Sequence, residues 1–136
     1  MTENATNNNK IPYGSNSKFI LAKKYAFVTA FENSYYPGYI TEKLWDPLIA
    51  GTLPIYLGAP DVTHLLPEHS FINVNDFSTF DDLANYIEFL IDHKTEYYSY
   101  HAWREQEISS DIKETWKFLE QDTNCRICRW GAENLY

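Results

Sequence analysis

Residues 25–58 decide the fold, and they read YAFVTAFENSYYPGYITEKLWDPLIAGTLPIYLG. Two runs within this stretch, Tyr25–Phe31 and Leu53–Leu57, are apolar and β-prone, so they predict buried strands. The polar segment Glu32–Tyr39 follows the first run and contains Asn, Ser, Pro and Gly, which is typical of a loop. A strand, a loop, a helix and a second buried strand in this order predict that the two strands pair in parallel.

A short helix is predicted between the two strands. Thr41 suits its N-cap, and Glu42 suits its first turn, where the helix dipole favours a carboxylate. Gly51 suits the position just after its last residue, Ala50. Pro47 falls inside the helix, where it removes one backbone hydrogen bond and is expected to kink the C-terminal part.

The following residues continue the alternation of strand and helix. Phe71–Val74 predicts a third short strand, and Thr79 suits the start of the clearest helix, where Asp82 is placed to form a capping box. That helix has one apolar face, formed by Phe80, Leu83, Ala84, Ile87, Leu90 and Ile91. We therefore predict the α/β class, with a Rossmann-like parallel sheet and ligands bound beyond the carboxyl ends of its strands.

The distribution of charge limits the possible partners. The net charge is −8, which disfavours nucleic acid because phosphate binding needs clustered Lys and Arg. Residues 1–44 nevertheless carry five Lys against three Glu, so a small anionic ligand would find its counter-charges there. No apolar run approaches the roughly 20 residues of a membrane span, and the polar start of the chain has no signal core.

Metal binding and cysteine chemistry give weaker signals. Cys125 and Cys128 form one C-x-x-C pair, but a zinc site needs four ligands and the sequence has no second pair. Two alternatives remain for this pair: a local disulfide, or two free thiols. Asp81-Asp82 suits a helix cap better than a metal site. We predict no metal site, and the sequence leaves any dependence on divalent metals undetermined.

The segment from Glu32 to Lys43 combines groups that suit a nucleotide. A helix N-terminus presents free N–H groups and a partial positive charge, which favour a phosphate, and Lys43 adds a full charge there. Glu42 offers two acceptors for vicinal hydroxyls such as those of a ribose, and Tyr39 is able to stack on a base or a sugar. The alternative is an ordinary capped helix with a surface ion pair.

Three runs of this sequence resemble the signature of the α-1,3-fucosyltransferase family. They are Phe31–Ser34 (FENS), Tyr39–Leu44 (YITEKL) and Leu53–Gly58 (LPIYLG). The resemblance continues through the helix of residues 83–90 and covers residues 18–104 without a long gap. The C-terminal run Cys125–Trp130 is similar to the C-x-x-C tail of some members.

The resemblance implies a two-domain glycosyltransferase of the GT-B type, in which this chain corresponds to the C-terminal half that binds GDP-fucose. It divides the chain into a polar N-terminal tail (1–17), the GDP-fucose-binding α/β domain (18–122) and a C-terminal tail with the C-x-x-C pair (123–136). The family transfers fucose from a β-linked diphosphate to an acceptor oxygen with inversion. Such a reaction needs in-line attack and a base that takes the acceptor proton.

The same resemblance assigns the donor site. It places Glu42 against the ribose hydroxyls and Lys43 against the diphosphate, and Glu32 matches a position close to the sugar. The implied donor-binding residues are Glu32, Asn33, Tyr39, Thr41, Glu42 and Lys43. The catalytic residue is unknown, because the family's general base is a carboxylate of the N-terminal half, which this sequence does not contain.

We therefore expect a fucosyltransferase that takes GDP-fucose as donor substrate, a glycan or glycoprotein as acceptor, and no tightly bound cofactor. The resemblance implies the Golgi membrane or lumen, although this sequence contains no signal or anchor. On its own the chain is expected to show no fucosyl transfer. The alternative is a truncated, non-catalytic module that binds a GDP-sugar and lacks the acceptor domain.

Overall fold

A three-stranded parallel sheet lies at the centre of the computed structural model, which describes residues 20–120, 128–129 and 132–133. The strands are β1 (Phe27–Phe31), β2 (Leu53–Leu57) and β3 (Ile72–Asn73), in the order β1-β2-β3. β1 and β2 pair over their whole length, from Phe27 opposite Leu53 to Phe31 opposite Leu57. The predicted α/β fold with a parallel sheet is therefore confirmed.

Two of the predicted strands are shorter in the structure. Tyr25 does not belong to β1, because its backbone N–H donates to the carbonyl of Ala22 at 3.0 Å and closes a turn. Val74 does not belong to β3, because it begins a 3-10 helix, Val74–Asp76. The side chain of Asn73 favours that change of conformation by accepting the N–H of Asn75 at 3.1 Å.

Helix α2 (Glu42–Ala50) begins and ends where the sequence predicts. The Thr41 side chain caps it by accepting the N–H of Lys43, and Gly51 follows it in the left-handed conformation, with φ of 85°. The helix continues through Pro47 to Ala50. Arg104, which is distant in the sequence, contacts this end of the helix, since its guanidinium donates to the Leu48 carbonyl at 2.8 Å.

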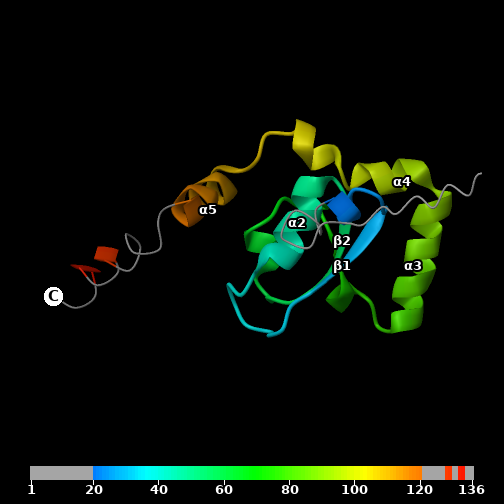
Figure 1. The fold of residues 1–136 in the computed structure, drawn as a ribbon, viewed down its shortest axis with the longest axis horizontal. Helices are drawn as coiled ribbons and strands as arrows, with labels where there is room; N and C mark the ends of the chain where they lie inside the picture. The colour runs from blue at the N-terminus through cyan, green and yellow to red at the C-terminus, as the bar shows by residue number, and fades with distance from the viewer. Residues whose placement is uncertain (1–19, 121–127, 130–131, 134–136) are drawn as a thin grey trace, which may run out of the picture.

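Apolar clusters on the two faces of the sheet fix the helices that cover it. Alternate side chains of β2 point to opposite faces, so Tyr56 packs with α2 and Ile55 with α3 (Phe80–Asp92). The α2 side contains Ala30, Leu44, Leu48, Tyr56, Val62 and Leu66. The α3 side contains Leu53, Ile55, Ile72, Val74, Leu83, Leu90 and Tyr100. The two helices accordingly lie on opposite sides of the sheet (Figure 1).

Further helical elements follow β2 in the chain. They are the 3-10 helices Val62–His64 and Ala102–Glu105, and the helices α4 (Lys94–Ser99) and α5 (Ser110–Glu120). Trp116 attaches α5 to the α2 side, because its indole N–H donates to the Leu65 carbonyl at 3.0 Å. In the described residues, no helix is long and apolar enough to cross a bilayer. The predicted domain limits at residues 18 and 122 lie outside the described residues.

Asp82 caps α3 as the sequence predicts, and this cap can be tested. Its carboxylate accepts the N–H of Thr79 at 3.1 Å, and the Thr79 hydroxyl accepts the N–H of Asp82 at 3.1 Å. Thr79→Ala removes one half of this capping box and should lower the free energy of unfolding by about 1 kcal/mol. Urea unfolding followed by circular dichroism measures the change. Thr79→Ser keeps the hydroxyl and should unfold close to the wild type; equal losses in both variants would contradict the assignment.

Candidate ligand-binding site at the start of helix α2

The loops that follow β1 and β2 lie side by side at the carboxyl edge of the sheet. The N–H of Glu32 donates to the Leu57 carbonyl at 2.8 Å and extends the parallel ladder by one residue. Farther along the first loop, the N–H of Gly38 donates to a carboxylate oxygen of Asp61 at 2.9 Å. Gly38 has a φ of 73°, a backbone conformation that glycine adopts without strain. These contacts hold the loop before α2 at both ends.

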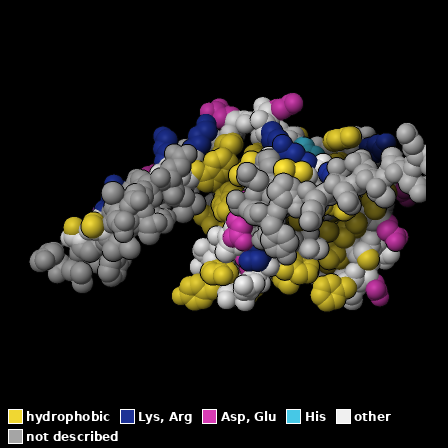
Figure 2. Space-filling view, in the orientation of Figure 1, with side chains coloured by type: hydrophobic (Ala, Val, Ile, Leu, Met, Phe, Trp, Pro, Cys, Tyr) yellow, Lys and Arg dark blue, Asp and Glu magenta, His cyan; other side chains and the backbone are white. Residues whose placement is uncertain are grey.

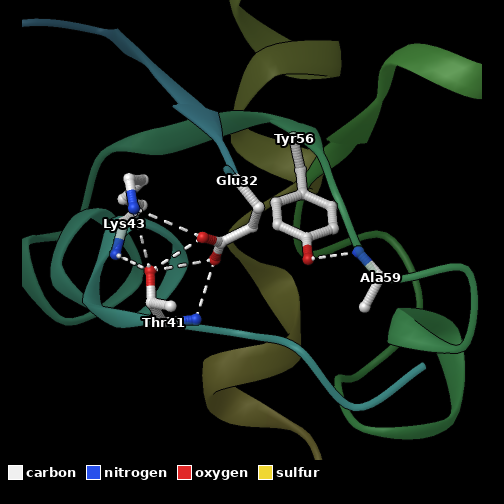
Figure 3. Close-up of polar contacts among 5 residues, drawn as sticks. All are labelled: Glu32, Thr41, Lys43, Tyr56 and Ala59. Carbon is white, nitrogen blue, oxygen red and sulfur yellow. Dashed lines mark hydrogen bonds and ion pairs between the residues drawn. The ribbon is translucent and has the colours of Figure 1, made fainter. Parts of the chain in front are cut away.

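The carboxylate of Glu32 is the centre of a buried polar group. One of its oxygens accepts the backbone N–H of Thr41 at 2.7 Å, and the other accepts the Thr41 hydroxyl at 2.8 Å. The Lys43 ammonium lies 3.4 Å from the second oxygen. Figure 3 shows all three groups converging on Glu32 from the start of α2. The side chain of Glu32 has an exposed fraction of 0%.

Tyr56 and Gly58 enclose the other side of this group. Gly58 lies so close that a Cβ added to it would be 2.6 Å from Cγ of Glu32 and would overlap the Tyr56 hydroxyl. That hydroxyl accepts the N–H of Ala59 at 2.8 Å (Figure 3). Burial raises the pKa of Tyr56, and the bond from Ala59 offsets part of the increase. Tyr56 is thus a neutral phenol beside the buried carboxylate.

Lys43 and Glu42 face outward from the same turn of the helix. Lys43 retains an exposed fraction of 31%, and its ammonium contacts Glu32 and the Thr41 hydroxyl, which leaves a third N–H donor for a ligand. The backbone N–H of Glu42 has no hydrogen-bonding partner among the described residues. Both residues border a cleft of about 360 Å³. The other described residues that line it are Leu21, Ala22, Tyr25, Val28, Thr29, Asp46 and Pro47.

Two of the predicted site residues lie elsewhere on the loop. Asn33 and Tyr39 are exposed and lie outside the cleft. The neighbouring Tyr35 and Tyr36 are more exposed still, at 64% and 70%. Figure 2 shows hydrophobic side chains exposed along the lower edge of this face, below the position of α2 in Figure 1. The structure therefore brings together Glu32, Thr41 and Lys43, places Glu42 beside them, and leaves Asn33 and Tyr39 in solvent.

The sequence did not predict three residues that shape the site. Tyr56 and Gly58 enclose Glu32, and Asp61 anchors Gly38. All three lie at or just after the end of the second predicted strand, where ligands bind in parallel sheets, and Tyr56 and Gly58 belong to the run that resembles the family signature, but neither signal gave them a role. The possible disulfide between Cys125 and Cys128 stays untested, because Cys125 lies outside the described residues; Cys128 is exposed.

The parallel sheet, with helices on both faces and polar groups at the start of the helix after β1, defines the class of α/β domains in which ligands bind at the carboxyl edge of the sheet. A model of the family described as glycosyltransferase family 10 (fucosyltransferase), C-terminal part, matches residues 3–134. The chain therefore belongs to this family of fucosyltransferases, and the resemblance seen in the sequence is confirmed.

Individual relatives agree with the family assignment. An alpha-(1,4)-fucosyltransferase of Arabidopsis thaliana is 38% identical over 114 residues, covering 81% of this chain and 28% of that protein. GDP-fucose protein O-fucosyltransferase 3 of Gallus gallus is 45% identical over 117 residues, covering 85% of this chain and 23% of that protein. The chain thus spans about a quarter of the length of these curated relatives.

Solved structures show the same fold. A crystal structure of an alpha1,3-fucosyltransferase with GDP-fucose has a TM-score of 0.64 and 32% sequence identity, covering 85% of this chain and 38% of that one. A crystal structure of an alpha1,3-fucosyltransferase with GDP has a TM-score of 0.54 and 41% identity, covering 57% of this chain and 23% of that one. The expected likeness to the C-terminal half of a GT-B glycosyltransferase is confirmed.

Proposed function

We propose that this chain binds GDP-fucose at the start of α2 and is the donor half of an inverting fucosyltransferase. The observation that carries the proposal is that two donors, the Lys43 ammonium and the unbonded backbone N–H of Glu42, belong to residues that border the same open cleft. Both groups attract a diphosphate, and their effects add to that of the helix dipole. The solved relatives with GDP or GDP-fucose support this choice of ligand.

The proposed residues have distinct parts in the reaction. Lys43 stabilises the negative charge that develops on the departing diphosphate. Glu42 accepts hydrogen bonds from the ribose hydroxyls, which orients the donor. Asn33 and Tyr39 are proposed to close on the donor from the exposed loop. Inversion requires in-line attack by the acceptor and a base, which we assign to the acceptor-binding half of the enzyme.

The acceptor and the location of the whole enzyme follow from the same proposal. The relatives include an alpha-(1,4)-fucosyltransferase and a protein O-fucosyltransferase, so a glycan or a glycoprotein is proposed as acceptor. An enzyme acting on such acceptors is proposed to work in the Golgi membrane or lumen. Transfer assays with the present chain and a glycan acceptor should give no product, because the proposed base belongs to the acceptor-binding half.

Glu42→Ala tests the proposed contact with the ribose. The variant should weaken GDP binding about tenfold, because a charge-assisted hydrogen bond contributes roughly 1.5–3 kcal/mol. It should have much less effect on 2′,3′-dideoxy-GDP, which lacks both hydroxyls. Isothermal titration calorimetry measures both ligands.

Asp46→Ala is the matched control for this experiment. Asp46 lies one turn farther along α2, borders the same cleft and carries the same charge. Removing it should leave the preference for GDP over the dideoxy ligand unchanged. If Glu42→Ala and Asp46→Ala behave alike with both ligands, Glu42 does not bind the ribose.

A further inference from the structure

The resemblance to the family places Glu32 close to the sugar, but its contacts point into the protein. Its carboxylate receives the N–H and the hydroxyl of Thr41 at 2.7 and 2.8 Å, and the Lys43 ammonium at 3.4 Å. Tyr56 and Gly58 cover its remaining side. Because the side chain has no exposed surface, a ligand could reach it only by displacing these groups.

The buried position of Glu32 gives its contacts a large energetic effect. An isolated carboxylate costs several kcal/mol to remove from water, so it persists in the interior only when charged and hydrogen-bonding partners compensate. Here the compensating partners are Thr41, which is the N-cap of α2, and Lys43, which borders the cleft. A change at Glu32 must therefore alter the start of α2 and the orientation of the Lys43 ammonium.

We propose that Glu32 is a positioning residue of the donor site, which acts on the diphosphate through Lys43 and does not contact the donor itself. This inference rests on the proposed function of the cleft. Glu32 closes the loop onto α2 through Thr41 and restrains the Lys43 ammonium, so that its remaining N–H is aimed outward. The restraint lowers the conformational entropy that the flexible lysine side chain loses when the diphosphate binds.

The negative charge of Glu32 and its positioning role predict opposite changes in GDP affinity when Glu32 is replaced, which makes the inference testable. A carboxylate near the diphosphate repels it, so an effect of charge alone would make GDP bind more tightly when Glu32 is replaced. If positioning dominates, the same replacement weakens GDP binding. The sign of the change in affinity therefore separates the two roles.

The first experiment compares GDP with guanosine, which lacks the diphosphate, on the whole chain. Glu32→Ala should weaken GDP binding about tenfold, and Glu32→Gln should weaken it in the same direction, because both variants lose the negative charge that pairs with the ammonium. Guanosine, followed by ligand-observed NMR, should bind all three proteins alike. Unchanged or tighter GDP binding by Glu32→Gln, which keeps the size of the side chain, would overturn the positioning role.

A double-mutant cycle asks whether Glu32 acts through Lys43. In a Lys43→Ala background, Glu32→Gln should cause almost no further loss of GDP affinity, because the group that it positions is already gone. Losses that simply add would show that Glu32 affects GDP by another route and would overturn the inference. If the wild type does not bind GDP, the proposed function of the cleft is wrong, which is a different outcome from a failure of the positioning role of Glu32.

The second measurement needs no nucleotide and tests the contact itself. The Thr41 amide should exchange slowly with deuterium in the wild type and in Glu32→Gln, since an amide oxygen still accepts its N–H. It should exchange fast in Glu32→Ala, with the core amides of β2 unchanged. Fast exchange of the Thr41 amide in the wild type would overturn the proposal whether or not GDP binds.

Discussion

Lys43→Ala is expected to weaken GDP binding tenfold or more, one of the two largest effects predicted for this chain. Among the described residues that border the cleft, the Lys43 ammonium is the one full positive charge. Its charge-assisted hydrogen bond to a diphosphate oxygen should contribute roughly 1.5–3 kcal/mol, and a loss of about 1.4 kcal/mol is already tenfold in affinity. Calorimetry with GDP on the two proteins measures the change.

Lys113→Ala provides the matched control for charge. Lys113 lies on α5 and forms an exposed ion pair with Glu107 at 3.3 Å, away from the cleft. Its removal changes the net charge by the same amount and should leave GDP affinity unchanged. Equal losses in the two variants would mean that GDP responds only to the overall charge. Raising the salt concentration should reduce the difference between wild type and Lys43→Ala, since screening weakens the contact of a partly exposed charge.

The fold could be predicted where local chemistry defines both ends of an element. β2 has the predicted bounds, Leu53–Leu57, because Gly51 ends the helix before it and Gly58 follows it. Residues 41–51 also behave as predicted, with Thr41 as the cap and Gly51 in the left-handed conformation. The start of β1 was wrong by two residues, since an apolar Tyr25 satisfies the strand pattern whether or not it pairs.

The candidate site was predictable in its place but not in its internal contacts. The sequence showed which residues follow β1, and the structure joins Glu32, Thr41 and Lys43 there. It could not show that Glu32 turns inward, because that direction depends on Gly58, which belongs to another loop. Such a contact between segments distant in the sequence leaves no periodic pattern, so the only guide to Glu32 was the resemblance to the family, which placed it close to the sugar.

Gly58→Ala is the second change with a large expected effect, and it acts on the stability of the protein. An added Cβ would overlap the Tyr56 hydroxyl and lie 2.6 Å from Cγ of Glu32, both of which are held by other bonds. Overpacking of this kind should lower the free energy of unfolding by about 1–3 kcal/mol. Displacement of Glu32 should also speed deuterium exchange at the Thr41 amide. Urea unfolding and exchange NMR measure the two effects.

Two further variants separate this steric effect from a general cost of replacing glycine. Gly51 has a φ of 85° and open space around an added Cβ, so Gly51→Ala should cost about 1 kcal/mol through the backbone alone and leave Thr41 exchange unchanged. Tyr56→Phe removes the hydroxyl that the new methyl group would meet. In that background Gly58→Ala should cost less than in the wild type, a favourable coupling between neighbours in contact. Strictly additive losses would show that the Tyr56 hydroxyl contributes nothing to the cost, which would then come from the ring carbon Cζ of residue 56 or from Cγ of Glu32, both 2.6 Å from the added Cβ.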